Sequence, residues 1–292
     1  MTPRDILLAL LVVLVWGLNF IAIKWGVEEI PPLLLTALRY LCAALPAVFF
    51  IRPPKIAARV VIAYGVMVGV CQFGLLFVAI HMGMPAGLAS LVIQMQAFFT
   101  FGLAIVFLGE RPGLLQVGGA LVALGGIAVI GVERADGTAL WPLLMTLLGA
   151  VFWGGANVIT KKAGRIDMLA FVVWASLVPP LPLLGLSFLL EGPDAIGFAL
   201  MHLSARSLGV IAFNGYASTL VGFGLWSILL ARYPASVVAP FSLLVPVVGI
   251  ASAVLVLGEP LSGLEVAGSV LVFAGLLLNV FGPRRRAVAA AS

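Results

Sequence analysis

The sequence predicts an all-α polytopic membrane protein of ten transmembrane helices, arranged as two inverted five-helix repeats. One observation is composition: 63% of the 292 residues are hydrophobic, 9% are charged, and the mean hydropathy is +1.24. A soluble protein of this length cannot bury so much apolar surface away from water. Another is that apolar runs of about 20 residues, long enough to cross a bilayer, recur along the whole chain. No polar stretch is left that is long enough for a soluble domain.

The third observation is an internal repeat in the sequence. Pro85-Ala86, Gly109-Glu110 and Gly126 return 149 positions later as Pro234-Ala235, Gly258-Glu259 and Gly275. Trp16-Gly17 and Lys24 return 137 positions later as Trp153-Gly154 and Lys161. We therefore divide the chain into a first repeat, 1–135, and a second repeat, 136–292. Because each repeat holds five spans, an odd number, we expect the second to sit upside down relative to the first.

Charged residues, prolines and glycines separate ten apolar runs. We place the spans at 6–24, 33–51, 59–80, 86–108, 114–131, 140–160, 168–190, 207–230, 236–257 and 263–282. The first is expected to be retained and not to be a signal peptide, because Lys24, Glu28 and Glu29 follow it in place of a small-residue cleavage site.

Prolines mark several of these spans. The second, seventh and ninth contain internal prolines, and in membrane helices neighbouring helices can satisfy the backbone groups that proline frees. Pro85 and Pro234 begin the fourth and ninth spans, and we interpret them as ordinary helix starts, since proline suits the first turn. Pro240 and Pro246 are interior to the ninth span, so we expect a kink there and name both as gating candidates.

Basic residues predict the orientation, because cytoplasmic loops carry an excess of Lys and Arg. With the N-terminus inside, the inner loops hold twelve basic residues: Arg4, Arg52, Lys55, Arg59, Arg111, Lys161, Lys162, Arg165, Arg232, Arg284, Arg285 and Arg286. The outer loops hold three: Lys24, Arg134 and Arg206. Both termini are therefore predicted to be cytoplasmic. This placement also accounts for the net charge of +5, which we do not interpret as a sign of nucleic-acid binding.

The ordered motifs resemble those of a known family. Ten spans in two tandem units, with Gly-Glu after the fourth and ninth spans, are similar to the EamA branch of the drug/metabolite transporter superfamily. Segments 8–20, 83–92, 96–100 and 239–249 resemble bacterial exporters of O-acetylserine and cysteine, and the family also includes exporters of aromatic amino acids, threonine and methionine. The resemblance implies a bacterial inner-membrane exporter of amino acids and related small metabolites. Alternating access between two inverted repeats is the mechanism that such a duplication predicts.

The membrane interior is predicted to lack acids. All eleven Asp and Glu residues fall at termini, in loops or at span ends, so the proton-carrying carboxylate of many coupled transporters is missing. We therefore expect facilitated or weakly coupled export. Amide, hydroxyl and aromatic groups can bind a zwitterion without a fixed charge. The substrate-binding candidates of this kind are Trp16, Asn19, Gln72, Gln94, Gln96, Phe99, Asn157, Asn214, Tyr216 and Ser242. Any one of them has an alternative role as a hydrogen bond between helices.

Two basic side chains need separate interpretation. His81, at the outer end of the third span, is a candidate for an outer gate, with a position at the lipid interface as the equal alternative. Arg39 lies inside the second span, and we expect it to extend outward toward Glu28 or Glu29 in a structural role. Lys24 and Lys161 are interpreted as anchors at the ends of spans.

The sequence contains few features of other functional classes. An intramembrane enzyme would need paired acids, a metal site or an activated nucleophile, and the motifs HExxH and GxSxG are absent. Cys42 and Cys71 lie in apolar runs and are expected to be reduced, with no metal and no cofactor. A membrane channel or a non-catalytic membrane scaffold stays open as the alternative. The expected partners are the amino-acid substrate and the lipid bilayer, with the protein as a monomer.

Overall fold

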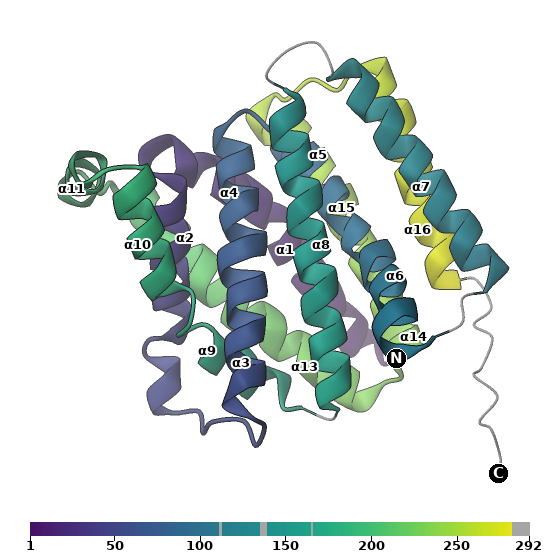
Figure 1. Cartoon of the computed structure of the whole chain (residues 1–292), viewed down its shortest axis with the longest axis horizontal. Helices are drawn as coiled ribbons and strands as arrows, with labels where there is room; N and C mark the ends of the chain where they lie inside the picture. Colours follow the sequence, from purple (N-terminus) through teal and green to yellow (C-terminus); the bar gives the residue numbers. More distant parts are fainter. Residues whose placement is uncertain (111–112, 135–138, 165, 282–292) are drawn as a thin grey trace.

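The computed structural model describes residues 1–110, 113–134, 139–164 and 166–281, and every regular element among them is helical (Figure 1). Within the described residues, ten helices are long and apolar enough to cross a membrane. The basic residues Arg111, Arg165, Arg284, Arg285 and Arg286, on which part of the orientation prediction rests, lie outside the described ranges.

The first five spans follow the predicted order. They are α1 (Pro3–Glu29); α2 and η1 (Pro32–Ala44, Ala47–Phe49); α3, η2 and α4 (Ala58–Tyr64, Gly65–Gln72, Phe73–His81); α5, η3 and α6 (Ala86–Val92, Ile93–Met95, Gln96–Leu108); and α7 (Leu114–Glu133). The first is longer than predicted, because the helix continues past Lys24 to Glu29. Lys24, expected in an outer loop, is therefore part of the helix.

The last five spans also match the predicted order. They are α8 (Leu140–Ala163); α9 and α10 (Met168–Ala175, Pro180–Leu190); α12, η4 and α13 (Ala205–Ala212, Phe213–Val221, Gly222–Arg232); α14, η5, α15 and η6 (Ala235–Val238, Ala239–Leu243, Leu244–Ser252, Ala253–Leu257); and α16 (Gly263–Phe281). The sequence did not predict α11 (Pro193–Met201), a short helix between the seventh and eighth spans. Between α9 and α10 the helix is interrupted at residues 176–179, and α10 begins at Pro180, since proline suits the first turn of a helix.

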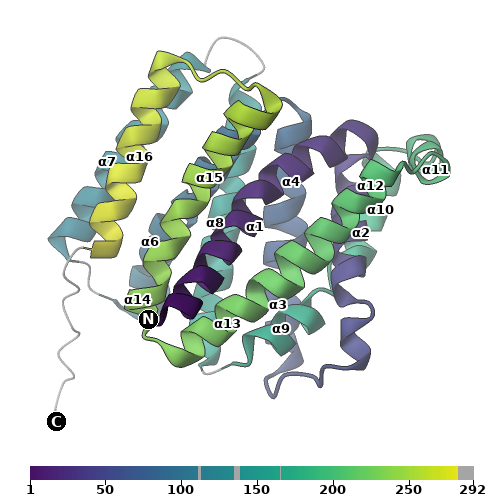
Figure 2. The ribbon, with the colours of Figure 1, turned by 180° about the vertical axis from the view of Figure 1, so that it is seen from behind.

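The fifth and tenth spans form a close pair at one edge of the bundle (Figures 1 and 2). Glycines bring the backbones together: a Cβ at Gly126 would lie 2.6 Å from the Gly268 carbonyl oxygen, and one at Gly275 would lie 2.4 Å from that of Gly119. These contacts are reciprocal, since Gly119 and Gly126 of α7 are equivalent to Gly268 and Gly275 of α16 at the 149-residue offset. The two helices are therefore antiparallel, as an inverted repeat requires.

Other spans also pack against spans of the opposite repeat. The first span, α1, packs on α15 of the ninth, and the equivalent sixth span, α8, packs on α6 of the fourth (Figure 2). The second span packs against the seventh, and the fourth against the ninth. The two repeats are therefore interleaved, and the interface between them runs through the middle of the bundle.

Local irregularities also recur at equivalent positions. Gly109 and Gly258 end the fourth and ninth spans with φ of 66° and 65°, and both have ψ of 22°. Such left-handed backbone favours glycine, which explains the glycine of the repeated Gly-Glu motif. The third and eighth spans each contain a π-helical segment, η2 and η4, at the same place in the repeat. π-Helical turns widen the helix and occur frequently at functional sites.

Candidate functional site

Arg39 is the most deeply buried charged side chain among the described residues, with 2% of its surface exposed. It lies near the middle of α2, and its Nη2 donates a hydrogen bond of 3.1 Å to Thr219 Oγ1, near the middle of the eighth span. The guanidinium carbon lies 4.2 Å from the ring centroid of Phe73 and 5.2 Å from that of Tyr40. A positive charge is therefore held deep in the bundle, with aromatic faces around it.

The prediction that Arg39 extends toward Glu28 or Glu29 is wrong. Glu28 pairs with Arg206, and Glu29 accepts hydrogen bonds from Ser204 and Ser207. Arg39 makes no ion pair with any described residue, and within the described chain its Nε and Nη1 have no hydrogen-bond acceptor. The side chain faces the repeat interface because α2 packs against η4 with Gly215 at the contact, where a Cβ would lie 2.8 Å from Cys42 Cβ.

A small cavity adjoins the guanidinium. Its volume is about 20 Å³, room for one water molecule. It is formed by the second, third, seventh and eighth spans, which are two repeat-equivalent pairs. The lining residues are Arg39, Tyr40, Tyr64, Gly65, Val68, Gly69, Phe73, Val172, Ala175, Ser176, Thr219 and Phe223. In transporters built from repeats, substrate sites lie at such an interface.

A larger cavity, of about 520 Å³, lies between α15 and α16. Apart from Ser269 its lining is apolar, and Pro246, Ile250 and Phe273 are typical members. Nothing in it offers a charge to a zwitterion, whereas its apolar walls suit lipid acyl chains. The smaller cavity at Arg39 is therefore the better candidate for a polar substrate.

The predicted amides fall into two groups. Asn157 Nδ2 donates to Gln96 Oε1 at 2.7 Å and to Thr100 Oγ1 at 3.0 Å, which ties the sixth span to the fourth. Gln94 Nε2 donates to the Ser242 carbonyl at 3.2 Å, which ties the fourth span to the ninth. By contrast, Gln72 is 1% exposed, and neither polar atom of its side chain has a partner among the described residues. Bonds between helices therefore occupy the amides of Gln94, Gln96 and Asn157 in this conformation.

The remaining predicted residues are placed as follows. Trp16 Nε1 donates to the Ser218 carbonyl at 3.0 Å, and its ring lies 5.3 Å from Phe223. Asn19 and Asn214 are buried, and each has a side-chain oxygen without a donor among the described residues. None of the ten candidates lines the Arg39 cavity. Phe99 packs at the α6–α8 contact beside Gly154, the Ser242 hydroxyl donates to the Ala239 carbonyl, and Tyr216 is 41% exposed.

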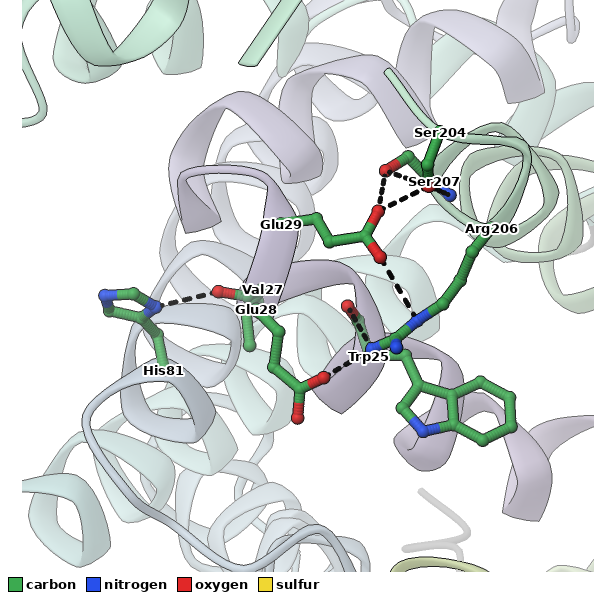
Figure 3. A network of polar contacts seen from close by, with 8 residues as sticks. All are labelled: Trp25, Val27, Glu28, Glu29, His81, Ser204, Arg206 and Ser207. Carbon is green, nitrogen blue, oxygen red and sulfur yellow. Dashed lines mark hydrogen bonds and ion pairs between the residues drawn. The ribbon is translucent and has the colours of Figure 1, made fainter. Parts of the chain in front are cut away.

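A polar network joins the first and eighth spans at the predicted outer face (Figure 3). Arg206 pairs with Glu28, lies 3.4 Å from Glu29 through its Nε, and donates to the Trp25 carbonyl. His81 lies at the edge of this network, where its Nδ1 is 3.0 Å from the Val27 carbonyl oxygen, and its side chain is exposed (Figure 3). The first, third and eighth spans are thus connected at the predicted outer face, where an outer gate would lie.

Two more carboxylates connect the repeats on the same side. Glu191, at the end of the seventh span, accepts backbone hydrogen bonds from Leu33 and Leu34 at 2.7 and 3.2 Å. Glu259, of the second Gly-Glu motif, accepts from the backbone of Ala86 and Gly87 at 2.9 and 3.1 Å. Each acid caps the first turn of a span in the other repeat, where the helix dipole favours negative charge.

The proline candidates lie where the ninth span changes its helical form. Pro240 is in the 3₁₀ segment η5, and Pro246 is near the start of α15, so the ninth span is not one regular helix. Pro85 and Pro234 directly precede α5 and α14, as expected for helix starts. Whether Pro240, Pro246 and His81 move during transport stays a prediction.

Removing the Arg206 side chain is expected to loosen the outer face. In an Arg206→Ala variant Glu28 and Glu29 lose their shared cation, so the first span separates from the eighth more often. The measurement is labelling of a single cysteine, Val27→Cys in a Cys42→Ser/Cys71→Ser background, by a membrane-impermeant thiol reagent added from outside. Labelling should be faster with Arg206→Ala than without it. Equal rates would mean that the network does not hold this face shut; Arg59→Ala, at the opposite face, is the control.

The chain is similar to known proteins over most of its length. The model of the EamA-like transporter family matches residues 4–132 and, a second time, residues 140–281. A protein of Salmonella typhimurium strain LT2 named probable amino-acid metabolite efflux pump is 44% identical over 298 residues, with 100% of both chains covered. A protein of the same name from Escherichia coli K12 is 42% identical over 292 residues, with 98% of both chains covered.

More distant relatives extend the comparison. A protein of Streptantibioticus cattleyicolor named probable terminal-alkyne amino-acid exporter is 29% identical over 290 residues, covering 95% of this chain and 94% of its own. A solved crystal structure with 20% identity superposes with a TM-score of 0.64 over 100% of both chains, which shows a shared fold. With two matches that span most of its length and relatives above 40% identity, the chain belongs to the EamA-like transporter family and is a multi-pass membrane protein.

Proposed function

We propose that this protein exports amino acids and closely related small metabolites from the cytoplasm by alternating access between its two repeats. The observation that carries the proposal is the 44% identity, over the full length of both chains, to a protein named probable amino-acid metabolite efflux pump. The basic residues of the inner loops favour an inner-membrane protein with both termini in the cytoplasm.

The contacts between the repeats support this mechanism. On the predicted outer side, Glu29, Glu191 and Glu259 each bind a group of the opposite repeat, and the Arg39 cavity is too small for an amino acid. On the predicted inner side, the ion pairs Asp5–Arg232 and Glu110–Lys161 also join the repeats. Export would require the outer and the inner contacts to open in turn. Because the two repeats consist of equivalent helices that pack on each other in equivalent ways, the inward-open and outward-open states would differ little in packing.

Counterflow tests this proposal directly. Purified protein is reconstituted into liposomes loaded with 5 mM of one unlabelled amino acid, and a trace of the same amino acid, labelled, is added outside. A carrier exchanges the two, so the label should accumulate transiently above its outside concentration. A panel of neutral amino acids and liposomes without protein complete the design. Label that equilibrates without overshoot would indicate a channel, and no flux for any amino acid would refute the proposed substrate class.

A further inference from the structure

Among the described residues, no acid inside a span supplies a counter-charge for Arg39. The described acids all lie at the ends of spans or beyond, where most have partners: Asp5 binds Arg232, Glu110 binds Lys161, and Glu265 binds Arg134. A charged side chain in the middle of a bilayer costs several kcal/mol unless it is paired, and such residues commonly mark a substrate pathway. The hydrogen bond to Thr219 and the contacts with Phe73 and Tyr40 leave the charge of this guanidinium without an acid partner among the described residues.

The free donors of Arg39 point to an anion with two oxygens. One nitrogen, Nη2, is oriented by Thr219, whose hydroxyl in turn donates to the Asn214 carbonyl at 2.9 Å. That carbonyl lies in the π-helical segment η4, so the wider helical turn serves to fix the hydroxyl. Nε and Nη1 have no acceptor among the described residues. A carboxylate binds a guanidinium through two parallel N–H groups. Nη2 has a second hydrogen besides the one given to Thr219, so it can complete such a pair with either Nη1 or Nε.

The rest of the cavity suits the other parts of an α-amino acid. Tyr64, Phe73 and Phe223 contribute aromatic groups, which can contact an ammonium group or an apolar side chain. The Ser176 hydroxyl donates to the Val172 carbonyl at 2.7 Å and keeps lone pairs free to accept a hydrogen bond. A single water molecule could fill the present volume, but it would supply acceptors and no charge.

We propose that Arg39 binds the carboxylate of the transported molecule, so that the site selects small carboxylates, α-amino acids among them, over the matching amides and amines. This inference deepens the proposed function and rests on it for the identity of the cargo. The cavity must widen for binding, and the carboxylate then supplies the missing counter-charge.

The first experiment measures binding and needs no transport. Melting temperatures of detergent-purified protein are recorded with alanine, methionine and phenylalanine, and with the carboxamide of each. At least one acid should stabilise the protein, with an affinity at least tenfold above that of its amide. Arg39→Gln should abolish the difference, and Thr219→Val should reduce it less. Arg39→Lys keeps the charge without the fork and should retain only part of the selectivity.

The possible outcomes separate this proposal from the proposed function. If no carboxylate binds better than its amide, or if Arg39→Gln keeps the selectivity, the proposal for Arg39 is overturned. If carboxylates bind through Arg39 but counterflow is absent, the transport proposal fails and the site remains. A purely structural Arg39 predicts that Arg39→Gln lowers the melting temperature while acid and amide keep their ratio. Arg59→Gln, at an exposed arginine in the first turn of α3, is the matched control.

Discussion

A methyl group at Gly69 is expected to prevent the third span from packing against the seventh. A Cβ built at Gly69 would lie 2.0 Å from Pro179 Cγ and 2.7 Å from its Cβ. Pro179 is a rigid ring at the break between α9 and α10, so it cannot rotate away as a long side chain would. Gly69 also lines the Arg39 cavity, and a shift of η2 would distort the cavity itself. Overpacking of a tight contact costs about 1–3 kcal/mol, and Gly69→Ala should reach the upper end of that range.

The measurement for Gly69→Ala is the yield of monodisperse protein in size-exclusion chromatography, followed by its melting temperature. We expect a severe loss of folded protein and no counterflow from what remains. The matched control is Gly102→Ala, also inside a transmembrane helix, where nothing lies within 4 Å of an added Cβ. That variant should be as stable as the parent or more stable, because alanine favours the helix over glycine. If both variants behave alike, the close approach at Pro179 is not a constraint on the fold.

The spans were predictable from sequence because the bilayer imposes a simple rule. A backbone in hydrocarbon must satisfy its own hydrogen bonds, so every long apolar run becomes a helix. This is why α5 with α6, predicted as one span at 86–108, begins at Ala86 and ends at Leu108. The short helix α11 was missed since no such rule governs a segment outside the membrane core, where nine residues starting at Pro193 give a weak signal.

The position of Arg39 shows what the sequence could not supply. Its depth in the second span was visible, but the direction of its side chain depends on which helices surround it. Glu28 and Glu29 were the nearest acids in sequence, yet Arg206, 178 positions from Glu28, occupies one of them. The partner of Arg39, Thr219, is 180 positions away. Contacts of this range arise from the packing of the two repeats and leave no local pattern.

The Gly-Glu motif was visible in the sequence, but the role of its glutamate was not. The glycine could be explained locally, since a left-handed turn ends the helix. The glutamate could not, because Glu259 caps the first turn at Ala86 and Gly87, 173 and 172 positions away. Gln72, which is buried and has no side-chain partner among the described residues, stays a predicted substrate contact beyond the Arg39 cavity.

Transport is expected to run on the substrate gradient alone. Coupling to protons requires a group that gains and loses a proton within the membrane, and the described acids lie at span ends or beyond. Arg39, the buried charge, keeps its proton at all physiological pH values because guanidinium is too weak an acid to lose it. A zwitterionic amino acid that pairs with Arg39 brings no net charge, and Arg39 returns to its starting position in every cycle. Neither a proton nor a net charge therefore crosses the membrane with the substrate, and the potential does not change the final level.

The test is uptake of a neutral amino acid into proteoliposomes that hold no ion gradient, repeated after a pH step of two units. Without the step, the inside concentration should rise to the outside concentration and stop; with it, the final level should be unchanged. A potassium–valinomycin potential serves as a second control and should also leave the level unchanged. Accumulation above equilibrium after the pH step would demonstrate coupling. His81→Gln would then be the first variant to examine, since His81 is exposed at the edge of the outer network.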